Sequence, residues 1–94
     1  MSEIRNMQKD MSNHVIHDHF WEAYNNLPQN VRKIILRKIE LLLENPRHPS
    51  LYLKKVGRLW SARISKQYRI LAREEEGTLV WYWVGKHDEY MRRI

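Results

Sequence analysis

The stretch WSARISKQYRIL, residues 60–71, decides the fold, because two alternating runs of apolar residues meet in it around a polar centre. Apolar side chains occupy every second position on both sides of residues 65–67: Trp60, Ala62, Ile64, Tyr68 and Ile70. Alternation with a period of two is typical of half-buried strands, and a short polar link between two such runs makes them neighbours. The stretch therefore predicts an antiparallel β-hairpin.

The same pattern predicts the register of this hairpin. A two-residue loop would set Ile64 beside Arg69 and mix core with charge on one face. A three-residue loop, residues 65–67, pairs Ile64 with Tyr68 and gathers the apolar positions on one face. Because a slip of one residue moves every side chain to the other face, burial selects the three-residue loop. Its consequence is that Arg63 lies directly opposite Arg69 on the other face.

Two amphipathic helices are predicted before the hairpin. From about Asp18, apolar residues recur with helical spacing as far as Leu27, and Pro28 suits the first turn of a second helix that runs to about Glu44. Pro46 ends it, because the residue before a proline is pushed out of the α region. The expected buried face of the second helix, which Leu43 widens, consists of Val31, Ile34, Ile35, Ile39 and Leu42.

Four strands are predicted from residue 51 onward, within residues 51–56, 59–65, 68–73 and 78–84, followed by a C-terminal tail or half-turn. Short connections make successive strands antiparallel. The expected fold class is α+β, with two N-terminal helices packed on one face of a small, mainly antiparallel four-stranded sheet. Residues 1–94 form one domain in this interpretation, and residues 1–16 are a mobile N-terminal tail.

The charge of the chain is concentrated in one segment. Lysine and arginine number 17 against 11 acidic residues, which gives a net charge of +6 and a pI near 9.8. Residues 51–72 contain several of these cations and no acid, so a polyanion or an acidic protein is the expected partner.

The chain has no cysteine, which excludes disulfides and thiolate chemistry. Without a signal peptide or an apolar run long enough for a membrane span, a cytoplasmic protein without membrane contact is expected.

The facing arginines indicate a phosphate site. Like charges opposite each other destabilise a sheet, and a bound phosphate would offset that cost, although solvation and salt screening are the simpler explanation for surface arginines. His87 and Tyr90 follow the last predicted strand, and imidazole is the commonest proton-transfer group near neutral pH. Arg63, Arg69 and His87 together suit RNA cleavage without a metal ion. The 2′-hydroxyl must lose a proton, cations must hold the phosphorane, and the leaving oxygen must gain a proton. Tyr90 is expected to stack on a base or to orient a phosphate.

Two other patterns have competing interpretations. HVIHDH, residues 14–19, suggests a metal site, but its spacing does not place the histidines on one face of a helix or strand, so an ordinary polar segment is favoured. Trp60, Trp81 and Trp83 could stack on bases, but their apolar alternation favours the core.

The order of motifs resembles the RelE/ParE superfamily of bacterial type II toxins over roughly residues 17–94. The motifs are LPxxVRxxIxxKIxxLLxNP (27–46), HPSL (48–51), WSARISKQYRIL (60–71) and VGKHDEY (84–90). RelE-like members are ribosome-dependent mRNA interferases, whereas ParE-like members poison DNA gyrase without being nucleases, and both are neutralised by a small antitoxin. The sequence departs from the pattern in two ways. The family's N-terminal strand is not evident before Phe20, and the tyrosine follows the histidine more closely than in RelE.

The resemblance implies roles for individual residues. Arg69 resembles the transition-state arginine of the family and Arg63 the basic residue of the preceding strand. His87 falls where RelE-like enzymes place a catalytic arginine or histidine, and Tyr90 resembles their C-terminal tyrosine. The residues expected to contact RNA or the ribosome are Lys54, Lys55, Arg58, Lys66, Arg73 and Lys86.

The expected function is therefore that of a toxin that cleaves mRNA on the ribosome, with no cofactor and no metal. Two alternatives stay open: a ParE-like gyrase inhibitor, and a basic RNA-binding domain without enzymatic activity. The expected partners are mRNA, the ribosome and a cognate antitoxin. The antitoxin would be an acidic, partly disordered segment that covers residues 51–72 within a toxin–antitoxin hetero-oligomer.

Overall fold

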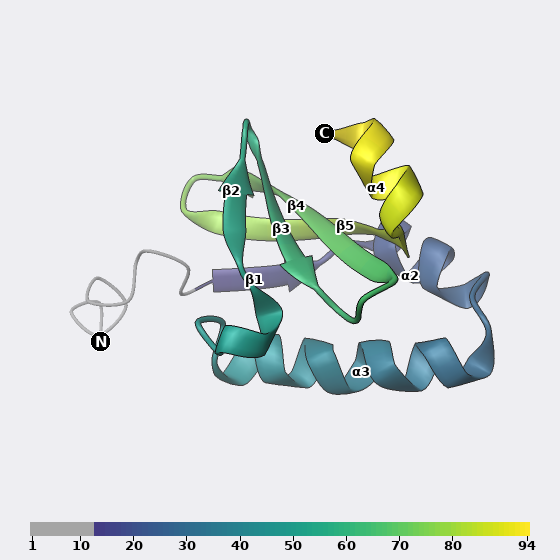
Figure 1. The fold of residues 1–94 in the computed structure, drawn as a ribbon. Helices are drawn as coiled ribbons and strands as arrows, with labels where there is room; N and C mark the ends of the chain where they lie inside the picture. Colours follow the sequence, from purple (N-terminus) through teal and green to yellow (C-terminus); the bar gives the residue numbers. More distant parts are fainter. Residues whose placement is uncertain (1–12) are drawn as a thin grey trace.

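The structure, a computed structural model, describes residues 13–94 and has the α+β fold that the sequence predicts. Its elements in chain order are β1 (Asn13–Ile16), α2 (Asp18–Asn25), α3 (Gln29–Glu44), η1 (Pro49–Leu51), β2 (Lys54–Val56), β3 (Leu59–Arg63), β4 (Tyr68–Glu75), β5 (Thr78–Lys86) and α4 (His87–Arg93). The strands form one sheet in the order β1-β5-β4-β3-β2. In Figure 1, α3 runs along one side of this sheet and α4 stands on the other. None of the helices in the described part of the chain has the length and apolar character needed to cross a bilayer.

Strand β1 corrects the prediction of four strands and of a tail over residues 1–16. Residues 13–16 pair in parallel with β5, so the sheet formed by residues 13–94 has five strands and is mixed. The indole of Trp81 also donates a hydrogen bond to His14 Nδ1 (2.9 Å). Because β5 supplies the backbone partners, a short polar segment forms a strand that its own alternation did not reveal. The rest of the expected tail, residues 1–12, lies outside the described residues.

Helices α2 and α3 agree closely with the predicted spans. Val31, Ile35, Ile39 and Leu42 of α3 are buried, as predicted, and pack with the apolar face of the sheet. The prediction is wrong for Ile34 and Leu43, because these side chains are 39% and 53% exposed and so lie outside the buried face. A single layer of sheet covers only a narrow stripe of a helix, and these two residues lie beside that stripe.

Two predicted segments take a different form in the structure. The expected strand over residues 51–56 is shortened to β2, because Pro49 begins the short 3-10 helix η1, and Tyr52 follows it in a left-handed conformation (φ 47°). At the C-terminus, the expected tail or half-turn is the seven-residue helix α4. This helix packs through Tyr90 against Leu71 and Trp83, and that packing stabilises a segment too short to be helical alone.

The predicted register of the central hairpin is confirmed. Arg63 pairs with Arg69 in the β3–β4 ladder, and the backbone N–H of Ile64 donates to the carbonyl of Tyr68 (3.0 Å). The loop over residues 65–67 has the predicted length, and Ala62, Ile64, Tyr68 and Ile70 belong to the main core. Burial of one face has therefore set the two arginines opposite each other on the other face.

A β-bulge in β5 divides the buried tryptophans between the two faces of the sheet. Ala72 pairs with Trp81 and Leu71 with Trp83, so Tyr82 is an extra residue on β5. Trp81 therefore joins the main core beneath α2 and α3, whereas Trp83 joins the smaller cluster beneath α4. The prediction that the tryptophans belong to the core is confirmed for these two, and Trp60 packs half-buried at the edge of the main core.

Gly85 is required by the ring of Trp83. A Cβ added at Gly85 would lie 2.3 Å from the nearest atom of that ring, which is held between Leu71 and Tyr90 in the cluster beneath α4. Gly85 is also the β5 residue that pairs with Arg69. The ring of Trp83 therefore packs against the backbone of β5 at the residue that pairs with Arg69.

We expect Gly85→Ala to lower the free energy of unfolding by about 1–3 kcal/mol, because the added methyl group overpacks a buried ring. Urea unfolding followed by tryptophan fluorescence measures this change. The double variant Gly85→Ala/Trp83→Leu, compared with Trp83→Leu alone, should show a much smaller loss. An equal loss in both backgrounds would contradict this packing.

Candidate functional site

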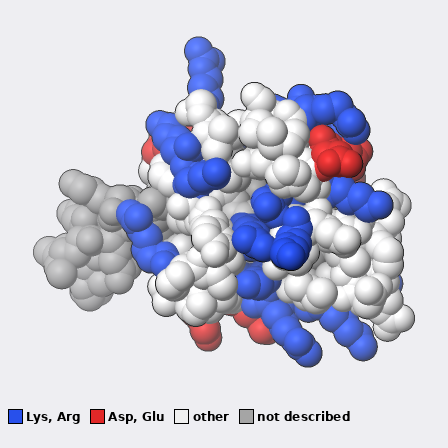
Figure 2. Space-filling view, in the orientation of Figure 1, with Lys and Arg blue, Asp and Glu red and all other residues white. Residues whose placement is uncertain are grey.

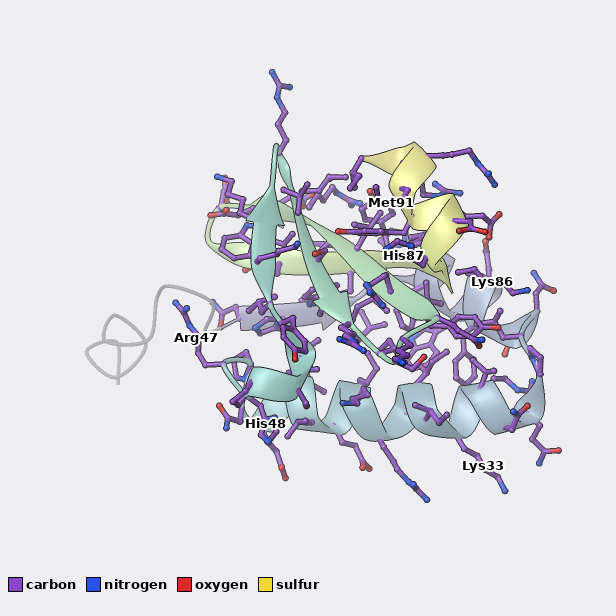
Figure 3. All side chains as sticks on the ribbon, in the orientation of Figure 1. Lys33, Arg47, His48, Lys86, His87 and Met91 are labelled. Atoms are coloured by element: carbon purple, nitrogen blue, oxygen red, sulfur yellow. The ribbon has the colours of Figure 1, made fainter. Side chains whose placement is uncertain are left out.

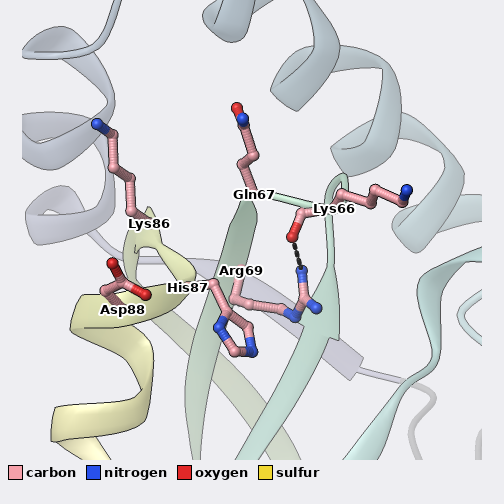
Figure 4. A pocket seen from close by; sticks show the side chains of 6 residues that line it. All are labelled: Lys66, Gln67, Arg69, Lys86, His87 and Asp88. Carbon is pink, nitrogen blue, oxygen red and sulfur yellow. Dashed lines mark hydrogen bonds between the residues drawn. The ribbon is translucent and has the colours of Figure 1, made fainter.

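The candidate site is built around Arg69, whose side chain is held by the loop that it follows. Its Nη1 donates hydrogen bonds to the carbonyls of Ser65 (2.6 Å), Tyr68 (3.1 Å) and Lys66 (3.3 Å). The bond to Lys66 is the dashed line in Figure 4. These carbonyls fix one corner of the guanidinium group. Among residues 13–94, no acceptor is found for Nε or Nη2, which are therefore the donors that a ligand can use.

Arg63 and Arg69 form a concentration of positive charge. Burial and the neighbouring charge of Arg63 lower the pKa of Arg69, and Tyr90 acts in the opposite direction. Arginine nevertheless stays charged in proteins, so the repulsion between the two groups persists as a cost to the folded state. Arg63 lies over the ring of Tyr52, with 5.2 Å between its Cζ and the ring centroid. An anion bound between the two arginines would relieve the repulsion.

His87 is delivered to this charge cluster by the junction of β5 and α4. It is the first residue of α4, and its backbone N–H donates to the carbonyl of Gln67 (2.7 Å) in the hairpin loop. That bond ties the start of α4 to the loop that holds Arg69. Figure 4 shows His87 and Arg69 close together, with the side chains of Gln67 and Lys86 extending in another direction.

Two adjoining hollows share Arg69 and His87. One, which we call the groove, has a volume of about 360 Å³ and lies between β2, β3 and α4. The other has a volume of about 350 Å³ and lies at the loop and the start of α4. Figure 2, drawn in the orientation of Figure 1, shows lysine and arginine side chains gathered near the middle of the molecule. In the same orientation, Figure 3 shows His87 and Met91 on α4, beside this cluster of cations. Of the predicted site residues, the groove brings together Lys54, Arg63, Arg69, His87 and Tyr90.

Tyr90 has a different position from the one predicted. Its ring is 4% exposed and packs with Leu71 and Trp83, so it is not placed to stack on a base, which corrects that expectation. The ring lies 5.7 Å from that of His87, centroid to centroid, and the hydroxyl donates to Ser61 Oγ (3.3 Å). Tyr90 therefore anchors α4 and supports His87 from beneath.

The remaining basic residues divide into two groups. Lys66 and Lys86 line the second hollow, next to Arg69 and His87. Lys55, Arg58 and Arg73 do not belong to either hollow. Their places in the fold explain why. Lys55 pairs with Trp60 and so lies on the opposite face from Lys54. Arg58 follows Gly57 in the turn between β2 and β3, and Arg73 forms an ion pair with Glu75 at the far end of β4.

The histidines of HVIHDH have structural contacts. His14 stacks on Trp81, and the ring of His17 accepts a hydrogen bond from the backbone N–H of His19 at the start of α2. Within residues 13–94, no group of three histidine, cysteine or acidic side chains is arranged to hold a metal ion.

Sequence reasoning missed Tyr52 and Ser61 as residues of the groove. Tyr52 was assigned to a strand, although Pro49 upstream is a signal for a turn. Ser61 lies on the same face of the sheet as Arg63, and it is 2% exposed because α4 covers it. No pattern in the sequence indicated α4, so this burial had no signal.

The comparisons with known proteins agree with the fold and with the motifs. The model of the ParE-like toxin domain matches residues 39–92, which is more than half of the chain. No curated protein sequence gives a significant match. Similar solved structures include a chain of the RelB–RelE antitoxin–toxin complex from Methanococcus jannaschii, with a TM-score of 0.60, 20% identity, and coverage of 85% of this chain and 98% of that one.

Two proteins from E. coli have the same fold. YafQ has a TM-score of 0.64 and 9% identity, covering 83% of this chain and 96% of its own. The isolated RelE toxin has a TM-score of 0.55 and 19% identity, covering 87% and 97%. At these identities the likeness concerns the fold, whereas the family model concerns the sequence. The chain belongs to the ParE-like toxin family, within the RelE/ParE superfamily that its motifs indicated.

The facing arginines predict a distinctive dependence of stability on salt. Arg63→Met removes one of two opposed charges and keeps the apolar stem. Raising the sodium chloride concentration should increase the free energy of unfolding more for the wild type than for the variant, because salt screens the repulsion. The expected difference is a few tenths to about 1 kcal/mol. Urea unfolding at both salt concentrations measures the difference. Arg37→Met on α3 is the control, and an equal change for both variants would show that the arginines do not interact.

The anchoring role of Tyr90 predicts a graded loss of stability. Tyr90→Phe removes the hydroxyl that reaches Ser61 and should cost about 1 kcal/mol, whereas Tyr90→Ala removes the buried ring and should cost about 3 kcal/mol. Urea unfolding gives both values. If alanine costs no more than phenylalanine, the ring does not hold α4 on the sheet.

Proposed function

We propose that this toxin is an endoribonuclease that cleaves mRNA bound to the ribosome, using side chains and no metal ion. The observation that carries the proposal is that Arg63, Arg69 and His87 line one groove. A cation pair beside an imidazole matches the two requirements of phosphodiester cleavage, which are stabilisation of charge on the phosphorane and transfer of protons.

In the proposed reaction, the ribose 2′-oxygen attacks the adjacent phosphorus. The O2′–P bond forms as the P–O5′ bond breaks, which yields a 2′,3′-cyclic phosphate and a free 5′-hydroxyl. The 2′-hydroxyl gives up one proton and the leaving O5′ gains one, so the step is balanced. His87 serves one of these transfers, and Arg69, with Nε and Nη2 available, holds the phosphorane together with Arg63.

The cationic residues around the groove support an RNA substrate. Lys54 lines the groove, and Lys66 and Lys86 line the second hollow, so positive charge continues on both sides of Arg69 and His87. A strand of RNA that passes through both hollows would meet these cations, and in the second hollow also the carboxylate of Asp88. Neutralising phosphates in this way releases counterions and supplies affinity that does not depend on sequence.

We propose an acidic, partly disordered antitoxin as the protein partner. The structures from Methanococcus jannaschii and Pyrococcus horikoshii that share this fold are complexes of RelE with RelB. In the present chain, an acidic segment over residues 51–72 would neutralise the facing arginines and close the groove, forming a hetero-oligomer. Binding of this kind weakens as salt rises.

A second candidate, inhibition of DNA gyrase without nuclease activity, is favoured by the name of the matching family, the ParE-like toxin domain. Such a toxin has no use for His87 as a proton-transfer group. A third candidate, a basic domain that binds RNA without cutting it, needs Arg69 for affinity alone. These functions differ in what they damage in a cell, so they can be separated directly.

We expect His87→Gln and Arg69→Ala each to lower the cleavage rate at least about 100-fold and to abolish growth arrest, because each removes a proton-transfer group or an oxyanion-stabilising donor. The measurement is induction in a bacterium followed by mapping of new mRNA 5′ ends. His19→Gln on α2 and Arg37→Ala on α3 are the matched controls, since both are exposed residues away from the hollows.

The same induction distinguishes the alternatives. DNA breaks linked to gyrase, together with unchanged mRNA ends, would replace the nuclease proposal with gyrase inhibition. Growth arrest that survives His87→Gln, in cells that show neither kind of damage, would favour the RNA-binding domain. Circular dichroism of the purified variants confirms that loss of toxicity is not loss of folding.

A further inference from the structure

The groove has two chemically different halves. One half carries the cations Lys54, Arg63 and Arg69 with His87, and the other half is apolar. The apolar half is lined by Tyr52 and Val56 from the strand side and by Met91 and Ile94 from α4. The nuclease proposal uses only the cationic half, so it leaves the apolar half without a role.

The apolar lining is unusually exposed. Tyr52 is 61% exposed, Met91 54% and Ile94 46%. Within residues 13–94, Tyr52 is the one exposed residue among the phenylalanines, tyrosines and tryptophans. The tryptophans that the sequence offered as stacking residues are buried or half-buried, so Tyr52 is the aromatic ring that this surface presents to a ligand.

The backbone holds Tyr52 in a conformation that is costly for a tyrosine. Its φ of 47° and ψ of 45° lie in the left-handed region, where a residue with a Cβ loses about 1–2 kcal/mol. The turn that imposes it is secured from both sides. The backbone N–H of Tyr52 donates to Pro49 (3.1 Å), and the neighbouring Leu51 is fully buried. Glycine would adopt this backbone without strain, so strain is carried here with an exposed aromatic ring, as occurs at ligand-binding positions.

Arg63 links the two halves of the groove. Its Cζ lies 5.2 Å from the centroid of the Tyr52 ring, and its backbone pairs with Arg69 across the β3–β4 ladder. A cation over an aromatic ring is attracted by its π-electrons, so this contact orients the ring beside the phosphate-binding charges. The two halves are therefore joined as one site, in which an aromatic platform lies next to a phosphate site.

We propose that the apolar half of the groove is a nucleobase subsite of single-stranded RNA, in which a base stacks on Tyr52 opposite Met91 and Ile94 while its neighbouring phosphate lies at Arg63 and Arg69. This inference rests on the proposed nuclease function and adds the element that positions the nucleotide. A volume of about 360 Å³ is within the range of small-ligand sites. Stacking tolerates any base, so the subsite orients the chain more than it reads sequence.

The test uses a six-nucleotide RNA in which every ribose is 2′-O-methylated, because this RNA has no 2′-hydroxyl to attack and binding is measured without cleavage. A matched series lacks one base at each position in turn. Fluorescence anisotropy with the purified full chain gives the dissociation constants. We expect loss of one particular base to weaken binding by about 5- to 100-fold, which is the range for stacking of a base on an aromatic side chain.

Variants of Tyr52 should reproduce that loss. Tyr52→Phe keeps the ring and should bind like the wild type. Tyr52→Leu and Tyr52→Gly should weaken binding of the intact RNA by a similar factor and remove the effect of deleting the base. Because glycine relieves the left-handed strain, Tyr52→Gly should also melt at the same temperature as the wild type or higher. Weaker binding in a protein that is at least as stable separates recognition from folding.

Tyr82→Leu is the matched control, because Tyr82 also carries an arginine over its ring, with Arg73 Cζ at 5.8 Å, but lies outside both hollows. It should bind RNA like the wild type. Equal weakening by Tyr82→Leu and Tyr52→Leu would overturn the proposal. So would wild-type binding that does not depend on any base, in which case the apolar half serves a protein partner. Failure of the wild type to bind this RNA at all would overturn the subsite alone, because the proposed nuclease acts on mRNA held by the ribosome and is tested separately by the mapped mRNA ends.

Discussion

The pairing of Arg63 with Arg69 is the constraint on which the site depends. The arginines themselves do not determine this pairing. The register is set by the apolar residues that alternate with them, because all of these must reach the same core. The folded protein therefore accepts a repulsion that it could avoid only by exposing its core. It limits the cost by directing one corner of Arg69 at three backbone carbonyls, and the remaining donors are left for an anion. Burial of one face thus places two opposed cations on the other.

The second face of the sheet is completed by elements near the C-terminus. The bulge at Tyr82 turns Trp83 away from the main core and toward α4, and Gly85 leaves space for its ring. The cluster formed with Tyr90 holds α4 in place, and the backbone bond from His87 to Gln67 joins the start of that helix to the hairpin loop. His87 is consequently positioned by packing rather than by a flexible tail. The same helix forms one wall of the groove and so links the stability of this small cluster to the geometry of the site.

Much of this arrangement follows from the sequence. The elements that could not be predicted from it were missed for physical reasons. The alternation in residues 60–71 predicted both the hairpin and the opposed arginines, since burial gives register a strong signal. Strand β1 was missed because its backbone partners come from β5, more than sixty residues away. Helix α4 was missed because its stability comes from one buried ring, and this hid the burial of Ser61 and Tyr90. Tyr52 was misassigned because an apolar alternation does not reveal a left-handed residue after a proline turn.

The central proposal is that one phosphodiester is held between the two facing arginines and His87. The most direct measurement is an experimental structure of the protein with a 2′-O-methylated RNA dinucleotide. The account predicts a phosphate within hydrogen-bonding distance of Arg69 Nε or Nη2, with Arg63 and the imidazole of His87 on either side of it. A phosphate bound at another face of the sheet, or cations at Arg63 and Arg69 that remain unliganded while the RNA binds elsewhere, would contradict it.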